Sequence, residues 1–254
     1  MKKRKVAILT LPLHSNYGGL LQAFALQKAL TSLGHESLLI NNDTSNYPNW
    51  RKRISFVKQK VFQLIKGGSV NRPDLTSKKN KKVIGEHSAK FVERYINKTD
   101  LVPAIFNFED VKSYNFGGYI VGSDQVWRPN YTPSIATYFY DFLETISSVK
   151  KISYAASFGV DHWQYNSQET KSCAKLAKMF NAISVREDSG IILCQENLNV
   201  DAVKVLDPTL LIDKHDYEVL VENAQLSKPK GKLFTYILDR SAENIDMEER
   251  AAKY

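Results

Sequence analysis

The sequence has little cysteine and no long apolar run. Its 254 residues include only Cys173 and Cys194, which are far apart and lack the close spacing of metal ligands. We therefore predict neither a disulfide framework nor a zinc-stabilised fold, and we expect a reduced, cytoplasmic location. No apolar stretch approaches the ~20 residues that a bilayer crossing needs. The five histidines show no metal-ligand spacing, so no bound metal is predicted.

Several common sequence signals are also missing. The basic start is followed by a short apolar stretch that Pro12 and His14 interrupt, without a small-residue cleavage site. We interpret Val6–Thr10 as a first buried strand and not as a signal peptide. The chain contains no GxGxxG, P-loop lysine, Gly-x-Ser-x-Gly elbow or Cys/His nucleophile arrangement. These absences argue against dinucleotide and Walker-type sites and against the corresponding hydrolases.

The net charge of +8 suggests nucleic acid until its position is considered. Residues 51–100 hold 14 Lys and Arg against 4 Asp and Glu. This surplus of 10 exceeds the charge of the whole chain, so the remainder is slightly acidic. No interleaving of basic and aromatic residues accompanies the basic segment, and we predict no nucleic-acid partner.

Apolar runs alternate with helical patterns along most of the chain. A strand, a loop and a helix at Leu20–Leu33, stopped by Gly34, open the sequence. Further helices are predicted at Gln168–Phe180, Asp188–Gln195 and Tyr217–Ala224. This alternation predicts an α/β fold with a Rossmann-like, doubly wound parallel sheet. The predicted strands are Val6–Thr10, Ser37–Ile40, Tyr119–Val121, Ile152–Ala155, Ala182–Val185 and Val203–Val205.

The basic segment reads as a helical insertion, 51–100, over one edge of the sheet. It contains an amphipathic helix at 51–66 and a second helix at Lys79–Tyr95. The first could make peripheral contact with anionic lipid headgroups, or it could simply dock on the sheet through its apolar face. We expect residues 1–227 to form the N-terminal domain. A polar linker and the start of a C-terminal domain, with a strand at Leu233–Leu238, are expected in 228–254.

The segment Tyr119–Tyr131 carries the densest group of polar side chains. A short apolar strand runs directly into Gly122, Ser123, Asp124, Gln125, Val126 and Trp127. Ligands in open α/β sheets bind where strand carboxyl ends meet their loops, so this loop is a candidate ligand site. The alternative is a structural junction in which Trp127 packs in the core.

Two other loops follow predicted strands with small or amide side chains. His14–Gly19 lies between the first strand and the first helix, where free backbone N–H groups and glycines favour a polar or anionic ligand. A tight turn with Asn16 or Ser15 as helix cap explains the same residues. Ser157 ends another strand after two alanines, which suits either a ligand or close packing of a neighbouring backbone.

Arg186 is an unusual residue at the start of a helix, because its charge opposes the helix dipole. A guanidinium at a strand's carboxyl end suits bidentate capture of phosphate or carboxylate. A structural pair between Arg186 and an aspartate is the alternative. Asp207, in the Asp-Pro turn after the last of these strands, is predicted to be mainly structural, accepting nearby backbone N–H groups.

Five motifs, taken in order, resemble the polysaccharide pyruvyl transferase family. They are HSNYGGLLQAFALQKAL, YIVGSDQVW, ISYAASFG, SVRED and VLDPTLL, and the resemblance extends from Lys5 to Asp213. The resemblance implies a two-domain fold similar to the GT-B glycosyltransferases. It also implies transfer of the pyruvyl group of phosphoenolpyruvate to two hydroxyls of a sugar, leaving a ketal and releasing phosphate, in capsular, exopolysaccharide or cell-wall polymer synthesis.

The resemblance further implies roles for particular residues. Phosphoenolpyruvate would be the substrate bound by Arg186, with no separate cofactor. The family's C-terminal domain supplies a histidine taken as the general acid. We expect that acid beyond Tyr254, and we expect this chain alone to be inactive. A sugar or lipid-linked oligosaccharide acceptor would lie near Asn16, Tyr17, Gly18, Gly19, Gln22, Ser123, Asp124, Gln125, Trp127 and Ser157.

Two other functions stay open at this point. A GT-B-type glycosyltransferase would keep the fold and use a nucleotide sugar as donor. In a non-catalytic, carbohydrate-binding half-enzyme, only the acceptor loops would bind a ligand. The sequence leaves the oligomeric state open.

Overall fold

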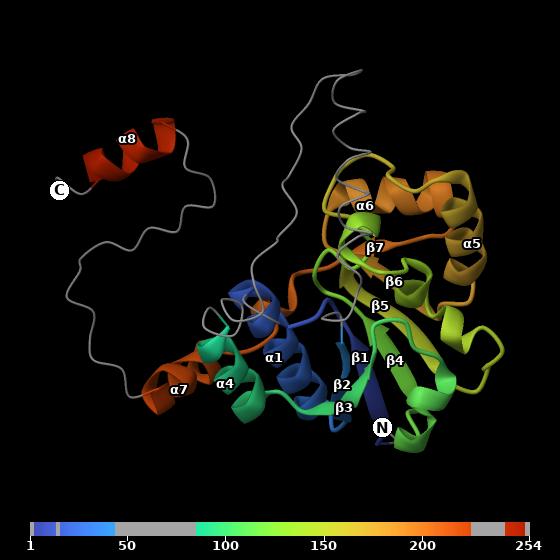
Figure 1. The fold of residues 1–254 in the computed structure, drawn as a ribbon, viewed down its shortest axis with the longest axis horizontal. Coiled ribbons are helices and arrows are strands. Elements are labelled where there is room, and N and C mark those ends of the chain that lie inside the picture. Colours follow the sequence, from blue (N-terminus) through green and yellow to red (C-terminus); the bar gives the residue numbers. More distant parts are fainter. Residues whose placement is uncertain (1–2, 14–15, 44–84, 225–241, 252–254) are drawn as a thin grey trace. The chain divides into compact units, whose positions relative to one another are not determined.

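The computed structural model describes residues 3–13, 16–43, 85–224 and 242–251 (Figure 1). Inter-residue contacts divide the chain into two compact units, Met1–Ile212 and Asp213–Tyr254. In the second unit the described helices are α7 (Lys214–Ala224) and α8 (Ala242–Ala251).

Three predictions are affected by these limits. The amphipathic helix at 51–66 and the strand at Leu233–Leu238 lie outside the described residues. The domain boundary near residue 227 stays a prediction.

An open sheet of seven parallel strands organises the described part of the first unit, in the order β3-β2-β1-β4-β5-β6-β7. It confirms the predicted α/β, Rossmann-like fold, and each predicted strand of this unit is present. The strands are β1 (Lys5–Leu9), β2 (Glu36–Asp43), β3 (Lys98–Pro103), β4 (Gly118–Val121), β5 (Lys150–Ala156), β6 (Ala182–Val185) and β7 (Val203–Lys204).

Strand β3 is the one element of the sheet that the sequence did not predict. Its first residues fall within the segment interpreted as a helical insertion, and it pairs with β2 at the edge of the sheet. Only Thr99 and Val102 of its six residues are buried. A strand with so little apolar content gives almost no period-2 signal.

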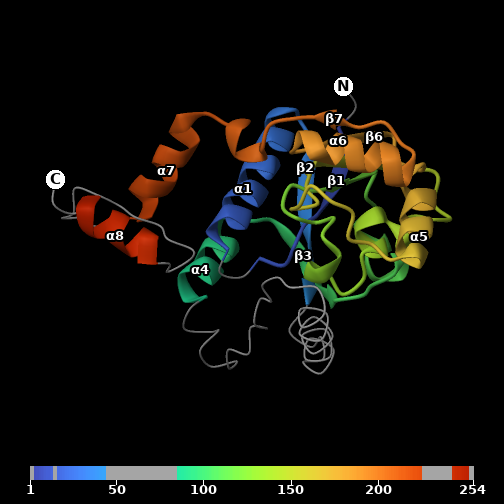
Figure 2. The ribbon, with the colours of Figure 1, turned by 90° about the horizontal axis from the view of Figure 1, so that it is seen from above.

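The alternation of side chains along β1 separates two apolar layers. Val6 and Ile8 pack with Leu26 and Leu30 of helix α1 (Tyr17–Ser32) on one face. Ala7 and Leu9 point to the other face and join a larger core. That second core includes residues from α5 (Ser167–Ala177) and α6 (Asp188–Leu193). Figure 2 shows α1 and α4 (Glu86–Tyr95) on one side of the strands and α5 on the other.

The helices begin and end where the sequence provides caps. Asn16 caps α1, which begins at Tyr17, three residues before the predicted start, and Gly34 follows its end with a φ of +82°, a conformation that favours glycine. Asn166 and Glu169 form a capping box at α5. Short helical turns complete the unit: η1 (Phe108–Asp110), η2 (Lys112–Tyr114), η3 (Pro129–Tyr131), η4 (Ala136–Phe139), η5 (Asp141–Leu143), the π-helical η6 (Cys194–Leu198) and η7 (Pro208–Leu210).

The strand order reverses between β1 and β4. From β1 the chain builds outward to β2 and β3, and from β4 it builds in the opposite direction to β7. Loops on either side of such a switch point diverge and leave a crevice at the carboxyl ends of the strands. The topology therefore directs the loops after β1 and β4 to the usual ligand-binding position of this fold.

Candidate functional site

The loops after β1 and β4 meet through Asn16 and Asp124. The Asn16 side chain donates from Nδ2 to Asp124 Oδ2 at 3.2 Å, while its Oδ1 accepts from the backbone N–H of Gly19 at 3.3 Å. One amide thus caps α1 and holds a carboxylate of the neighbouring loop. The loops come together as predicted, although His14 and Ser15 lie outside the described residues.

Arg186 follows β6 and is bound by acidic side chains from two segments. Its Nε donates to Glu187 Oε1 at 2.8 Å, and Nη1 donates to Asp207 Oδ2 at 3.4 Å and to the Ser123 carbonyl at 3.5 Å. Burial acts to lower the pKa of Arg186, but the hydrogen bonds and charges of Glu187 and Asp207 outweigh it and raise that pKa. The predicted alternative, a structural pair with an aspartate, is therefore present.

Gln22 links α1 to this ion-paired group. Its Nε2 donates to Asp207 Oδ2, while Asp207 Oδ1 accepts from the backbone N–H and the hydroxyl of Thr209. Asn16, Gln22, Asp124, Arg186, Glu187 and Asp207 are together called the carboxyl-edge cluster.

Ser157 connects the cluster to β5. Its hydroxyl donates to Glu187 Oε1 and accepts from the Gly159 N–H, both at 2.9 Å, and its side chain is fully buried. Ser157 therefore orients Glu187 through this hydrogen bond. Because it is buried, Ser157 has no exposed surface with which to contact a ligand directly.

Two glycines allow the loops of β4 and β5 to approach each other. Gly122 has a φ of +137°, and a Cβ there would lie 2.0 Å from the Tyr154 carbonyl oxygen. Gly159 has a φ of +70°, and its Cβ would lie 2.2 Å from Gln125 Oε1. Gln125 is held in place by Arg128, whose Nη1 donates to the same oxygen at 2.8 Å. A side chain at Gly122 would require the loop backbones to move, and one at Gly159 would displace the Gln125 side chain.

Trp127 corrects one of the predicted acceptor contacts. Its side chain is fully buried, stacks on Phe139 with ring centroids 4.8 Å apart, and donates from Nε1 to the Tyr138 carbonyl at 3.1 Å. A buried indole with a satisfied N–H is a core residue. The placement of Trp127 at the cleft is wrong, and the structural alternative is right for this residue.

The sequence profile of the polysaccharide pyruvyl transferase family matches residues 16–253, nearly the whole chain. The chain belongs to this family. The family indicates a transferase, and it confirms the resemblance drawn from the five motifs. A comparison with curated proteins returns no match. Among the described helices of this family member, none is both long and apolar enough to cross a membrane.

The remaining predicted acceptor residues of this pyruvyl transferase family member differ in exposure. Tyr17 and Gly18 are exposed at the start of α1, and Gly19 is buried, where an added Cβ would lie 3.4 Å from Asp124 Oδ2. Ser123 is buried, and its hydroxyl lacks a hydrogen-bond partner among the described residues. Within the cluster Asn16 is exposed, whereas Asp124 and Glu187 are partly exposed.

Sequence reasoning underestimated two acids of this site. Asp207 was predicted to accept nearby backbone N–H groups, yet it binds Arg186, and so does Glu187. Their position after adjacent parallel strands was a signal, because the carboxyl ends of β6 and β7 share an edge. The contact between Arg186 and Asp207 joins positions 21 residues apart, and no local sequence pattern specifies it.

The cluster carries one guanidinium and three carboxylates, so its formal charge is negative. Within the part of the chain that the structure describes, no His, Cys, Asp and Glu side chains form a group of three that could hold a metal ion. The chemistry available at the cluster is therefore that of amide and carboxylate hydrogen bonds around a single, internally paired cation.

Proposed function

We propose that this protein transfers the pyruvyl group of phosphoenolpyruvate to two hydroxyls of a sugar. The family membership supports the reaction class. The observation that carries the proposal for this chain is the contact between Asn16 and Asp124 at the switch point of the sheet. Carboxylate oxygens accept hydrogen bonds from sugar hydroxyl groups, and amides can both accept from them and donate to them. Such a site can therefore bind an uncharged ligand.

The proposed reaction balances without a cofactor. Carbon 2 of phosphoenolpyruvate forms a bond to each of two acceptor oxygens, and its bond to the bridging phosphate oxygen breaks. One hydroxyl proton goes to the methylene carbon, which becomes a methyl group, and the other leaves with the phosphate. The protein must therefore accept a proton from a hydroxyl and must help to deliver one to carbon.

Asp124 is proposed to accept the hydrogen bond and the proton of one acceptor hydroxyl. It is partly exposed, and it is oriented by Asn16 and by the backbone N–H of Gln125, which donates to Oδ1 at 2.7 Å. A carboxylate held from both sides keeps its position when the acceptor binds. General-base assistance of this kind is typically worth about 10²–10⁴-fold in rate.

Arg186 is proposed to bind the carboxylate of phosphoenolpyruvate. Among the described residues its hydrogen bonds are made by Nε and Nη1, so Nη2 keeps its donors for a ligand. Glu187 and Asp207 fix the plane of the guanidinium, but they also cancel its charge. Arg186 is therefore proposed to orient phosphoenolpyruvate, and not to neutralise the full negative charge of that substrate.

The acceptor is proposed to be a sugar of a capsular, exopolysaccharide or cell-wall polymer, free or linked to a lipid, and the reaction to take place in the cytoplasm. Binding of oligosaccharides prepared from the producing organism tests the acceptor site. Asp124→Asn should weaken binding by about tenfold. Asp201→Asn, an exposed aspartate ahead of β7, is the matched control and should leave binding unchanged.

Turnover by the full-length gene product tests the reaction. We expect phosphate release that requires both phosphoenolpyruvate and oligosaccharide, with a new ketal methyl signal in the NMR spectrum of the product. Sugar transfer from a nucleotide sugar would overturn the proposal in favour of a glycosyltransferase. Oligosaccharide binding without any turnover would overturn it in favour of a carbohydrate-binding protein.

A further inference from the structure

A groove with a volume of about 540 Å³ lies at the opposite edge of the sheet, where the strands begin. Lys5 opens β1, Gly117 directly precedes β4 and Lys150 opens β5, and all three line it. Because β4 pairs with β1 on one side and β5 on the other, these residues are adjacent in space. The turns η1 and η2 and the segment before β5 complete its walls. It is called the amino-edge groove.

Among the described residues, the amino-edge groove is lined by five cations and by no acid: Lys3, Arg4, Lys5, Lys112 and Lys150. Lys5 lies 3.6 Å from Glu36, and Lys112 pairs with Glu109. For Lys3, Arg4 and Lys150, no ion pair is present within the described ranges of the chain. Three cations of the groove thus have no ion-pair partner in the part of the chain that the structure describes, in contrast to the guanidinium of the carboxyl-edge cluster.

The backbone positions that carry these cations are fixed. Lys5 and Lys150 are fixed by the backbone pairing of β1 and β5 with β4, and the Arg4 side chain packs beside the Cα of Gly117. Like charges held together repel one another unless an anion binds between them. The arrangement is therefore a preformed site for negative charge, and a solvated run of lysines on one helix would not have this property.

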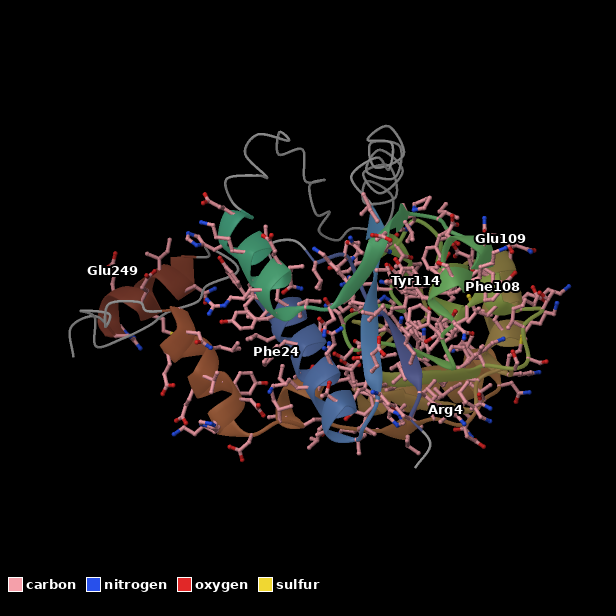
Figure 3. All side chains as sticks on the ribbon, turned by 90° about the horizontal axis from the view of Figure 1, so that it is seen from below. Arg4, Phe24, Phe108, Glu109, Tyr114 and Glu249 are labelled. Atoms are coloured by element: carbon pink, nitrogen blue, oxygen red, sulfur yellow. The ribbon has the colours of Figure 1, made fainter. Side chains whose placement is uncertain are left out.

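The floor of the groove is apolar. Phe116 and Tyr119 are buried beneath it, and Ile146 and Val149 are partly buried at its side. Tyr114 and Phe116 stack with centroids 5.5 Å apart, and Lys5 Nζ lies 5.6 Å from the Tyr114 centroid. Figure 3 labels Arg4, Phe108 and Tyr114 on the side of the strands away from Phe24 of α1.

Gly117 lines the hollow, and Gly118 follows it as the first residue of β4. A Cβ on Gly117 would come no closer than 3.8 Å to its neighbours, and one on Gly118 no closer than 3.6 Å. Both positions tolerate a side chain, and a large one on Gly117 would occupy space that the groove now leaves empty.

We propose that the amino-edge groove is a second binding site, for a phosphate-bearing ligand whose phosphate meets Arg4 and Lys150 and whose body rests on the apolar floor. Its volume lies within the usual ~300–1,000 Å³ of small-molecule sites. The phosphate can belong to a soluble molecule or to a lipid headgroup. The site is formed at the far edge of the sheet from the carboxyl-edge cluster, so it does not depend on the function proposed there.

Two probes distinguish the sources of phosphate. Inorganic pyrophosphate, titrated by calorimetry, represents soluble ligands. Vesicles with and without anionic phospholipid, in a flotation assay, represent headgroups. We expect binding to at least one probe and a decrease as salt rises, because partly exposed charges are screened within about 8 Å at physiological ionic strength. Binding to neither probe would overturn the proposal.

The double variant Arg4→Gln/Lys150→Gln should weaken the observed binding by about tenfold or more, since charge-assisted hydrogen bonds are lost. The matched control Lys171→Gln/Lys178→Gln removes the same charge from exposed positions on and just after α5. Equal weakening in both variants would show only a response to net charge and would overturn the site.

A second variant tests the hollow without changing its charge. Gly117→Leu should fill the groove and weaken binding, with thermal unfolding used to verify that the variant folds. Unchanged binding by folded Gly117→Leu would overturn the groove as the site. The groove is tested with pyrophosphate and vesicles and the carboxyl-edge cluster with oligosaccharides, so a failure of one proposal would be seen separately from a failure of the other.

Discussion

The two edges of the sheet are formed by the same strands, yet they hold charge in opposite ways. At the carboxyl edge Arg186 is bound by Glu187 and Asp207, and most polar atoms already have partners. At the amino edge Arg4 and Lys150 line a hollow without acids. The first arrangement fixes side chains in position for directional hydrogen bonds, whereas the second keeps charge available for an anion. The difference shows that a charged residue at a strand end is not by itself an anion site.

The largest difference in stability between the two edges is expected when the glycines at the two ends of β4 are substituted. Gly122→Ala places a Cβ 2.0 Å from a backbone oxygen at a φ of +137°. We expect it to lower the free energy of unfolding by about 5 kcal/mol, enough to unfold an ordinary domain.

Gly118→Ala is the matched control on the same strand. Its Cβ would meet ordinary contacts at 3.6 Å, and the change in stability should stay within about 1 kcal/mol. Urea denaturation of both variants measures the difference. Similar losses at the two glycines would mean that the tight approach at the carboxyl edge is absent.

A smaller effect is expected from the ion pairs of the carboxyl edge. Arg186→Ala leaves two partly buried carboxylates without their cation and should lower the free energy of unfolding by about 2 kcal/mol. Glu187→Gln removes one of those charges while keeping an acceptor for Arg186 and Ser157.

The double variant Arg186→Ala/Glu187→Gln should therefore lose about 1 kcal/mol less than the sum of the single variants. The exposed pair of Lys175 and Glu144, treated in the same way, should show a much smaller coupling. Strict additivity at Arg186 and Glu187 would contradict a structural role for the pair.

The smallest effect is expected at the amino edge and has the opposite sign. Lys150→Gln relieves repulsion among fixed cations and should raise the free energy of unfolding by about 0.5 kcal/mol or less at low salt. Lys204→Gln removes an exposed lysine that pairs with Asp188 and should lower it slightly. A loss of stability in Lys150→Gln would indicate that this lysine has a structural partner.

The fold was predictable because the strands of the centre are continuous apolar runs. Tyr119–Val121 is fully buried and reads as a strand without ambiguity, and Gly34 ends α1 where expected. The meeting of the loops after β1 and β4 followed from parallel pairing alone. Strand β3 could not be predicted in this way, because four of its six side chains are exposed.

The sequence predicted which loops of the site lie together, but not the tertiary contacts that their side chains make. Asn16 and Asp124 were expected at one edge, but the burial of Trp127 depends on Phe139 and Tyr138, which approach it through the fold of the η4 turn. The pairing of Arg186 with Asp207 is likewise a tertiary contact. The amino-edge groove gave no sequence signal, because its cations are dispersed from Lys3 to Lys150 and only the strand order brings them together.

The Asn16 side chain makes two hydrogen bonds, so a change at one of them can be detected at the other. Its amide holds Asp124 with one atom and the N–H of Gly19 with the other. A ligand that draws the Asn16 side chain away from Gly19 should loosen the first turn of α1, because the Gly19 N–H has no earlier carbonyl within its own helix to donate to. Hydrogen exchange at that one amide should therefore register events at the carboxyl edge without any label attached to the ligand.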